Sequence, residues 1–122
     1  MKYIHQRYIL FEILSPSTNE IPKSAVLKEI WRISQKLFGE MQVFQLGLWM
    51  IRWNPVHRIG ILRFDNTSKF VLLTTLLFIT RINGSPVIIH TRKTSGTIKG
   101  TLEVWRKYFT DIPIPPKDEE KK

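Results

Sequence analysis

The period of the hydrophobic pattern changes repeatedly along this chain, and this alternation constrains the fold more than any other feature of the sequence. Apolar residues alternate with polar ones where a half-buried strand is expected, and they recur at helical spacing where an amphipathic helix is expected. Strands are predicted over residues 7–13, 43–53, 58–64 and 87–92, and helices over residues 22–38, 68–81 and 101–109. The predicted order is therefore strand, helix, strand, strand, helix, strand, helix.

Turn and capping residues fall between these segments, as the assignment requires. Pro22 suits the first turn of a helix, and Gly39 suits the C-terminal cap of the same helix. One of residues 65–67 (Asp, Asn, Thr) can cap the second helix. Asn83-Gly84 tolerates positive φ and predicts a tight turn before the last strand. The short connection between the second and third strands predicts an antiparallel hairpin.

The order of the first six elements is the split βαβ pattern of the ferredoxin-like, RRM-like sandwich, an α/β (α+β) fold. We therefore predict a four-stranded antiparallel sheet with two helices on one face and an extra C-terminal helix. A length of 122 residues fits one domain, assigned to residues 1–110. Residues 111–122 are rich in proline and then in mixed charge, which predicts a disordered tail.

The sheet face without the two helices is expected to be unusually aliphatic. Alternation assigns to the helix-covered face Ile9, Phe11, Ile13, Trp49, Ile51, Leu62, Phe64, Val87 and Ile89. It assigns to the other face Tyr8, Leu10, Leu46, Leu48, Met50, Ile59, Ile61 and Ile88. Such a face needs a cover. The C-terminal helix can supply Trp105, Tyr108 and Phe109, and a protein partner could supply the rest.

The composition bounds the compartment and the class of partner. There are no cysteines, the N-terminus does not resemble a signal peptide, and the longest apolar stretch, 70–79, is too short to span a membrane. We expect a soluble, cytoplasmic protein with no membrane contact. The formal charge of +9 favours a polyanionic partner, most commonly nucleic acid.

A cluster of cations and hydroxyls follows the last predicted strand, where it passes into a loop. Amide, guanidinium, ammonium and hydroxyl groups are the donors to which phosphate oxygens bind. The candidate phosphate contacts are Arg92, Lys93, Ser95, Thr97 and Lys99, followed by His90 and Arg63. A solvated strand end with ordinary turn residues is an equally good interpretation of this cluster from the residues alone.

No catalytic or metal site is predicted. His5, His57 and His90 lie in unrelated segments, without metal-ligand spacing. Ser95 and His90 could be a nucleophile and its base, but no acid is expected to orient the imidazole. Base stacking on the sheet is not expected either, because the third strand is aliphatic where rings would be needed. Trp53 and His57, at the hairpin tip, could each stack a splayed base, but Trp53 is better interpreted as a core residue and His57 as an exposed turn residue.

Several of these segments together resemble the ribonuclease P protein component 2 family of archaea and eukaryotes. The main signature is Ile79-x-x-Ile-Asn-Gly-x-x-Val-Ile-Ile-His-Thr-x-x-x-Ser-Gly-Thr-Ile-Lys99. Further blocks of the family are matched, in order, by residues 7–12, 38–39, 47–49 and 60–63. The resemblance covers roughly residues 6–109 and depends on the motifs in combination.

The resemblance implies a role in removing the 5′ leader of precursor tRNA. In this family the ribonuclease P RNA performs the hydrolysis with Mg²⁺, so no catalytic residue, metal or cofactor is expected on this chain. It also implies pairing with the barrel-shaped protein component 3, and assembly as a dimer of heterodimers. Two alternatives remain: a general RNA-binding module of the same fold, such as a ribosome-associated protein, and a small-molecule-binding regulatory domain, against which the basic charge argues.

Overall fold

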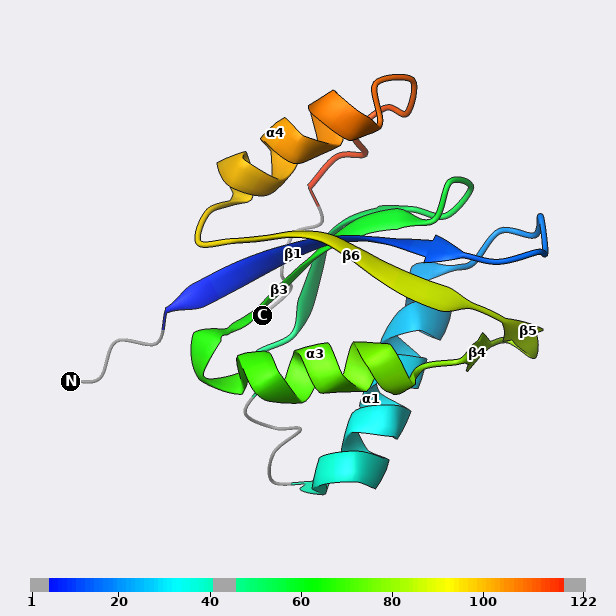
Figure 1. Cartoon of the computed structure of the whole chain (residues 1–122), viewed down its shortest axis with the longest axis vertical. Helices are drawn as coiled ribbons and strands as arrows, with labels where there is room; N and C mark the ends of the chain where they lie inside the picture. Colours follow the sequence, from blue (N-terminus) through cyan, green and yellow to red (C-terminus); the bar gives the residue numbers. More distant parts are fainter. Residues whose placement is uncertain (1–4, 41–45, 118–122) are drawn as a thin grey trace.

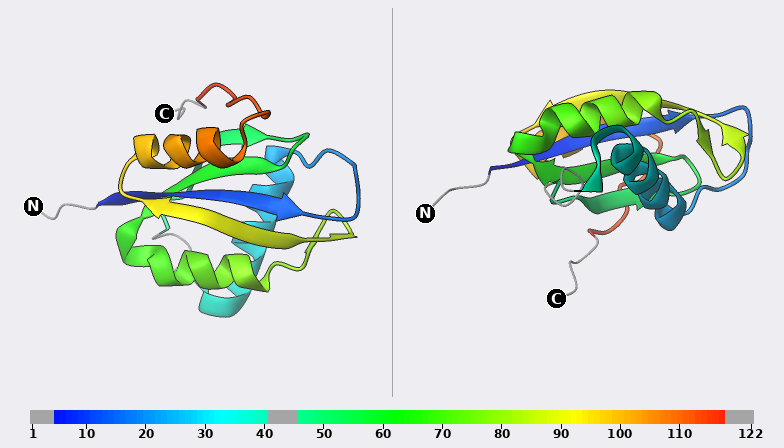
Figure 2. Two further views of the ribbon diagram at one scale, coloured as in Figure 1. Left: turned by 45° about the horizontal axis from the view of Figure 1, so that its top comes forward. Right: turned by 90° about the horizontal axis from the view of Figure 1, so that it is seen from below.

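The computed structural model describes residues 5–40 and 46–117 and confirms the split βαβ arrangement. The strands β1 (Gln6–Leu14), β2 (Trp49–Asn54), β3 (Ile59–Asp65) and β6 (Ile88–Ser95) form one antiparallel sheet in the order β2-β3-β1-β6 (Figure 1). The helices α1 (Lys23–Phe38) and α3 (Lys69–Phe78) cover one face, and α4 (Ile98–Tyr108) lies over the other (Figure 2). The short elements η1 (Asn66–Ser68), β4 (Arg81–Ile82) and β5 (Ser85–Pro86) lie in the connections. The prediction of a ferredoxin-like sandwich with an added helix is therefore correct.

The main core lies between the sheet and the pair α1 and α3. It contains fully buried side chains from β1 and β3, including Phe11 and Phe64, and the buried stripe of α1. Trp53 stacks on Phe11 with ring centres 5.8 Å apart and an interplanar angle of 19°. Its indole Nε1 donates a hydrogen bond of 2.9 Å to the carbonyl of Ile21, so the one polar atom of the ring is satisfied. The interpretation of Trp53 as a core residue is confirmed.

A second, smaller core lies under α4. Trp105 is completely buried there against Leu10, Ile51, Ile59 and Ile61. The C-terminal helix thus covers the aliphatic sheet face, and Trp105 and Phe109 contribute to the cover as predicted. The prediction is wrong for Tyr108, which is 60% exposed because it lies on the solvent side of α4.

The segment after α4 does not leave the domain at Asp111, as the prediction of a disordered tail required. Ile112 and Ile114 pack against the second core, and the carbonyl of Ile112 accepts a hydrogen bond of 3.1 Å from Trp105 Nε1. Arg52 Nη1 donates to the carbonyl of Pro115 at 2.7 Å. The prediction of disorder is wrong for residues 111–117, because these contacts satisfy buried polar groups that the composition does not reveal. Residues 118–122 lie outside the described part.

The strand predicted over 43–53 begins only at Trp49. Residues 43–45 lie outside the described part. Gly47 adopts a φ of +59°, which is not an extended conformation, so β2 begins after it. A register shift between Met50 and Arg52 marks a β-bulge in β2. The bulge reverses the alternation ahead of it, so the predicted faces were wrong there.

The reversal exchanges residues between the two cores. Trp49 and Ile51 pack in the core under α4, whereas Met50, Leu46 and Leu48 pack in the main core. Trp53, which follows the bulge, lies on the predicted side.

The ends of the later elements follow tertiary pairing. Helix α3 ends at Phe78 instead of residue 81, because β4 and β5 form a hairpin around Asn83-Gly84, whose φ angles of +52° and +79° confirm the predicted tight turn. Pro22 and Gly39 flank α1 as its N-cap and C-cap. Asp65 and Ser68 occupy the N-caps of η1 and α3 without a side-chain capping bond. Within the two described ranges, no helix is both long and apolar enough to cross a membrane.

Candidate functional site

Strand β6, at one edge of the sheet, carries most of the residues predicted to contact phosphate. His90, Arg92, Lys93 and Ser95 all belong to it, because its pairing with β1 continues as far as the pair Tyr8 and Ser95. The prediction that Lys93 and Ser95 lie in a loop is therefore wrong. A strand holds its side chains at fixed spacing, so these groups form an ordered row on a rigid element.

A β-bulge changes which of these side chains share a face. Leu10 pairs with Lys93 but Phe11 pairs with Thr91, which leaves Arg92 as the extra residue. Lys93 therefore lies on the face of its partner Leu10, which is the face covered by α4. The guanidinium of Arg92 lies on that face too, 5.6 Å from the ring centre of Phe109. The bulge thus places on one face two consecutive cations that strict alternation would separate.

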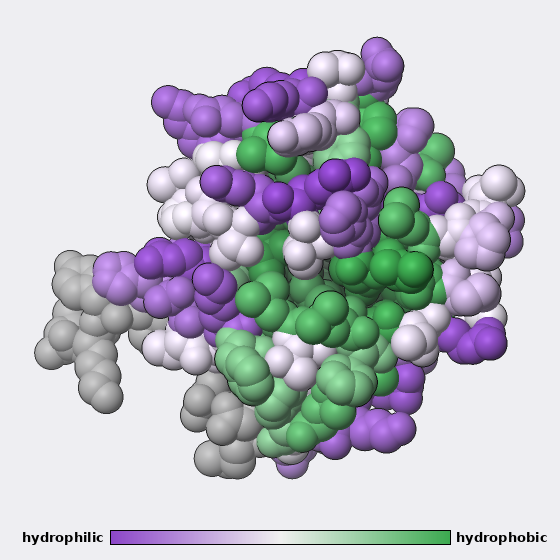
Figure 3. Space-filling model, viewed as in Figure 1, coloured by the Kyte–Doolittle hydropathy of each residue, from purple (hydrophilic) through white to green (hydrophobic). Residues whose placement is uncertain are grey.

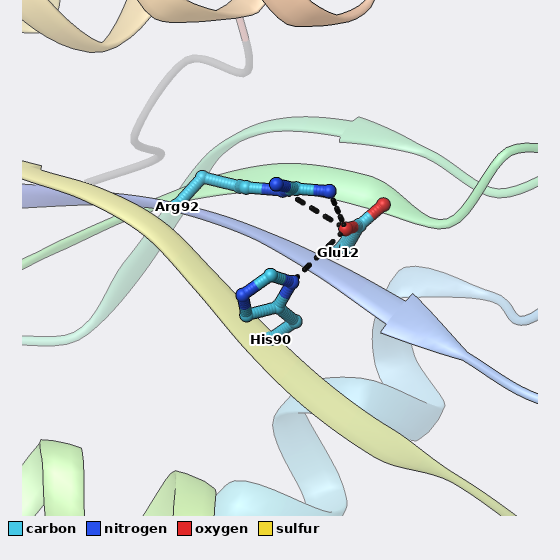
Figure 4. A network of polar contacts seen from close by, with 3 residues as sticks. All are labelled: Glu12, His90 and Arg92. Carbon is cyan, nitrogen blue, oxygen red and sulfur yellow. Dashed lines mark hydrogen bonds and ion pairs between the residues drawn. The ribbon is translucent and has the colours of Figure 1, made fainter.

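A carboxylate stands in the middle of this row (Figure 4). Glu12 Oε1 accepts hydrogen bonds from Arg92 Nε at 2.9 Å and Nη2 at 2.5 Å, and lies 3.2 Å from His90 Nδ1. The side chain of Glu12 is only 13% exposed, against 34% for Arg92 and 50% for His90. The carboxylate fixes the direction of both partners and offsets part of their positive charge.

The hydroxyls of Ser95 and Thr97 organise the junction between β6 and α4. Ser95 Oγ accepts a hydrogen bond from the backbone N–H of Thr97 at 3.2 Å, and Thr97 Oγ1 caps α4 by accepting from Gly100 N at 3.1 Å. A Cβ on Gly100 would overlap the Ser95 hydroxyl, so any larger residue there would force Ser95 to move. Lys99 is exposed in the first turn of α4. Both hydroxyls thus have a structural role, and their contact with phosphate stays a prediction.

Arg63 extends the basic surface across the sheet, and Arg7 lies at its end on the opposite face. Arg63, half-buried, stands opposite Tyr8 on β1 and Trp49 on β2. Burial raises the pKa of the neighbouring carboxyl of Asp65, and Arg63 partly offsets that rise. Arg7 was not among the predicted contacts, yet its guanidinium lies beside Gly96, with Nη1 3.5 Å from the position of a Cβ there. The signal that could have identified Arg7 is its place at the start of β1, which pairs antiparallel with the end of β6.

The structure does not assemble a catalytic centre from the histidines. Glu12 does orient the His90 imidazole, contrary to the prediction that no acid is placed to do so. Ser95 is nevertheless too far from His90 to be its nucleophile, because their partners on β1, Tyr8 and Glu12, are about 13 Å apart along the strand. Among the described residues, no group of three His, Cys, Asp or Glu side chains is placed to hold a metal ion.

An uncharged apolar surface lies on α3 (Figure 3). Residues 70–80 contain no charged residue. Phe70, Leu77 and Phe78 are 73%, 79% and 57% exposed, and the Phe70 ring contacts the edge of Phe38 on α1. A helix that is apolar on both its buried and its outer side is typical of an element covered by a partner. Among the described residues, α3 thus carries three exposed large apolar side chains, and on the sheet Leu14 and Ile88 are exposed at the end of β1 and the start of β6.

Comparisons with known proteins agree with one another. The model of the Rpp14/Pop5 family matches residues 7–104. Ribonuclease P protein component 2 of Pyrococcus abyssi is 38% identical over 93 residues, covering 76% of this chain and 77% of the relative. The ribonuclease P/MRP protein subunit POP5 of Schizosaccharomyces pombe is 30% identical over 107 residues, covering 76% and 77%. A chain in a cryo-EM structure of yeast ribonuclease MRP has the same fold, with a TM-score of 0.62 at 11% identity, covering 92% of this chain and 99% of that one.

Proposed function

Because the chain belongs to the Rpp14/Pop5 family, we propose that it is a protein subunit of ribonuclease P, which removes the 5′ leader from precursor tRNA. The family match over residues 7–104 carries this proposal, and relatives named ribonuclease P protein component 2 support it. The formal charge of +9 suits a protein that binds RNA. The hydrolysis is assigned to the RNA subunit and its Mg²⁺, and this chain supports the RNA.

The proposed RNA surface is the row along β6 with the start of α4. Arg92 and Lys93 project from one face because of the bulge, and His90 and Arg63 lie along the same face. Lys99 follows in the first turn of α4, and Arg7, which pairs with Phe64 of the opposite face, lies beside Gly96 at the end of the row. Their role is electrostatic: cations that neutralise phosphates stabilise the compact RNA conformation, in which Mg²⁺ binds. This mechanism lowers the Mg²⁺ concentration that the RNA needs.

The proposed protein surface is the outer side of α3. An uncharged apolar patch offers nothing to a polyanion but suits a protein partner. We assign it to the barrel-shaped component 3, because pairing two copies through this patch would bring together two chains of charge +9. Self-association of the resulting heterodimer then uses a different surface.

Reconstitution tests the subunit assignment. Cleavage of precursor tRNA is measured with a ribonuclease P RNA and component 3 at limiting Mg²⁺, with and without this chain. A higher rate or a lower Mg²⁺ requirement that depends on this chain is expected. Comparable binding to unrelated RNAs, with no gain in cleavage beside an active component 3, would instead indicate a general RNA-binding module.

A charge placed on α3 tests the partner surface. The Leu77 side chain is 79% exposed in the free chain, so the Leu77→Lys variant should fold normally. In native mass spectrometry this variant should no longer form the complex with component 3. Tyr108→Lys is the matched control, because Tyr108 is similarly exposed, at 60%, but lies on α4, over the other face of the sheet. If the Leu77→Lys variant instead kept the complex with component 3 but lost self-association, the α3 surface would be the contact between two copies of this chain.

A further inference from the structure

A hollow of about 690 Å³ lies beside β2, at the opposite edge of the sheet from β6. It lies between the start of α1, the β2–β3 hairpin and the C-terminal segment. Its lining residues are Glu20, Pro22, Lys23, Met50, Trp53, Pro55, Pro115, Pro116 and Lys117. Its volume is within the range of small-ligand sites, and neither the β6 surface nor the α3 surface includes it.

The wall of the hollow is a rigid aromatic and pyrrolidine surface. The Trp53 indole is held by its stack on Phe11 and by the hydrogen bond from Nε1 to the carbonyl of Ile21. The opposite wall is fixed by the 2.7 Å bond from Arg52 to the carbonyl of Pro115. Flat apolar surfaces that are already in place bind a planar ring with little loss of conformational freedom.

The charged groups of the hollow complement a nucleotide. Lys23, Lys117 and Glu20 are among its lining residues, so two side chains that end in ammonium groups and one that ends in a carboxylate border the hollow. Ammonium groups bind phosphate, and a carboxylate accepts hydrogen bonds from the N–H donors of a base edge. Guanine presents two adjacent donors on its pairing edge, whereas uracil presents a single donor between two acceptors.

We propose that this hollow accepts one unpaired nucleotide of an RNA strand, with a preference for guanosine over uridine. The base lies against Trp53 and the prolines, Glu20 binds its donor edge, and the two lysines bind the flanking phosphate. The inference rests on the proposed function for the source of the RNA. It adds a second RNA contact at the far edge of the sheet, which reads an extruded base, whereas the β6 row neutralises phosphates.

A proline-rich peptide is the competing occupant, because aromatic and proline-lined grooves also bind such segments. Charge favours the nucleotide: the lining carries two cations and one anion on a chain of +9. The experiment below separates the two.

The test follows the indole N–H signals of the tryptophans by NMR in the full chain. GMP, UMP, inorganic phosphate and a short polyproline peptide are titrated separately. We expect GMP to shift the Trp53 signal and UMP to bind about tenfold more weakly, the usual worth of one charge-assisted hydrogen bond. Glu20→Gln should remove that preference, and Lys23→Ala with Lys117→Ala should weaken both nucleotides. Lys36→Ala, exposed in the last turn of α1 and outside both the hollow and the β6 row, is the matched control and should leave these titrations unchanged.

Three results would overturn the proposal. They are no shift of the Trp53 signal with either nucleotide, the same shift with inorganic phosphate alone, or a shift with the peptide but not with GMP. The last result would assign the hollow to a protein. Because the titrations use no ribonuclease P RNA, their failure is distinguishable from failure of the reconstitution, which tests the subunit role directly.

Discussion

Replacing Glu12 with Gln is expected to strengthen RNA binding, although Glu12 is not a predicted contact. Its carboxylate accepts two hydrogen bonds from Arg92 and contacts His90, so it offsets charge at the centre of the β6 row. A glutamine oxygen can still accept from Arg92 and preserve its direction. The substitution therefore removes a negative charge while keeping the geometry.

The expected gain follows from the distance between charges. A phosphate bound to the outer side of Arg92 would lie about 7 Å from the Glu12 carboxylate. This distance is the sum of the two ion-pair contacts that the guanidinium makes, one on each side, and the width of the guanidinium itself. Two like charges at about 7 Å repel by about 0.6 kcal/mol in water and about 2.4 kcal/mol at an effective dielectric constant of about 20. Because the Glu12 side chain is only 13% exposed, the effect lies between these limits. Binding should become about 3- to 60-fold tighter.

The assay is a titration of labelled ribonuclease P RNA at several salt concentrations. Glu103→Gln, at an exposed position on α4, is the control for a change in net charge alone. Lys93→Ala should act in the opposite direction, weakening binding and reducing the salt slope by about 0.7–0.9. Equal effects of the Glu12 and Glu103 substitutions, or weaker binding by Glu12→Gln at unchanged Tm, would refute the reasoning.

Three further predictions concern stability. Gly100→Ala should cost about 1–3 kcal/mol in urea unfolding, because its Cβ overlaps the Ser95 hydroxyl, and Ser95→Ala should restore part of the loss. Ending the chain after Thr110 should lower Tm by at least about 4–8 °C by uncovering the second core, as thermal unfolding would measure. Burial raises the pKa of Asp65, so its ionisation opposes folding above that pKa. The Asp65→Asn variant should therefore be more stable than wild type at neutral pH. Urea unfolding should show that this difference in stability shrinks as the pH falls toward about 4.

The fold could be predicted because its local signals agree with its global arrangement. The turn at Asn83-Gly84 and the residues flanking α1 depend on local backbone preferences that the sequence states directly. The errors lie where distant contacts decide. The bulge in β2 reverses the faces of Trp49 and Met50, and strict alternation contains no sign of it. The order of residues 111–117 depends on the carbonyl partners of Trp105 and Arg52, which only the folded sheet brings near.

The candidate site was predictable in its chemistry but not in its electrostatics. The order of residues in the sequence indicates that the cations Arg92, Lys93 and Lys99 lie near a strand end. That Arg92 is bound to Glu12 depends on the register of two strands whose contact residues are 80 positions apart. Counting the cations in the sequence therefore overstates the positive charge of this surface, because Glu12 offsets part of it.

The central position of β1 sets the order in which the RNA surface can form. Its neighbours in the sheet are β3 and β6, so one side of β1 stays unpaired until the chain has been synthesised through Ser95. Pairings over such long sequence separations close late and slowly. The cations of β6 consequently acquire their common face only in the last stage of folding, and a nascent or partly folded chain offers RNA scattered charges instead of an ordered row.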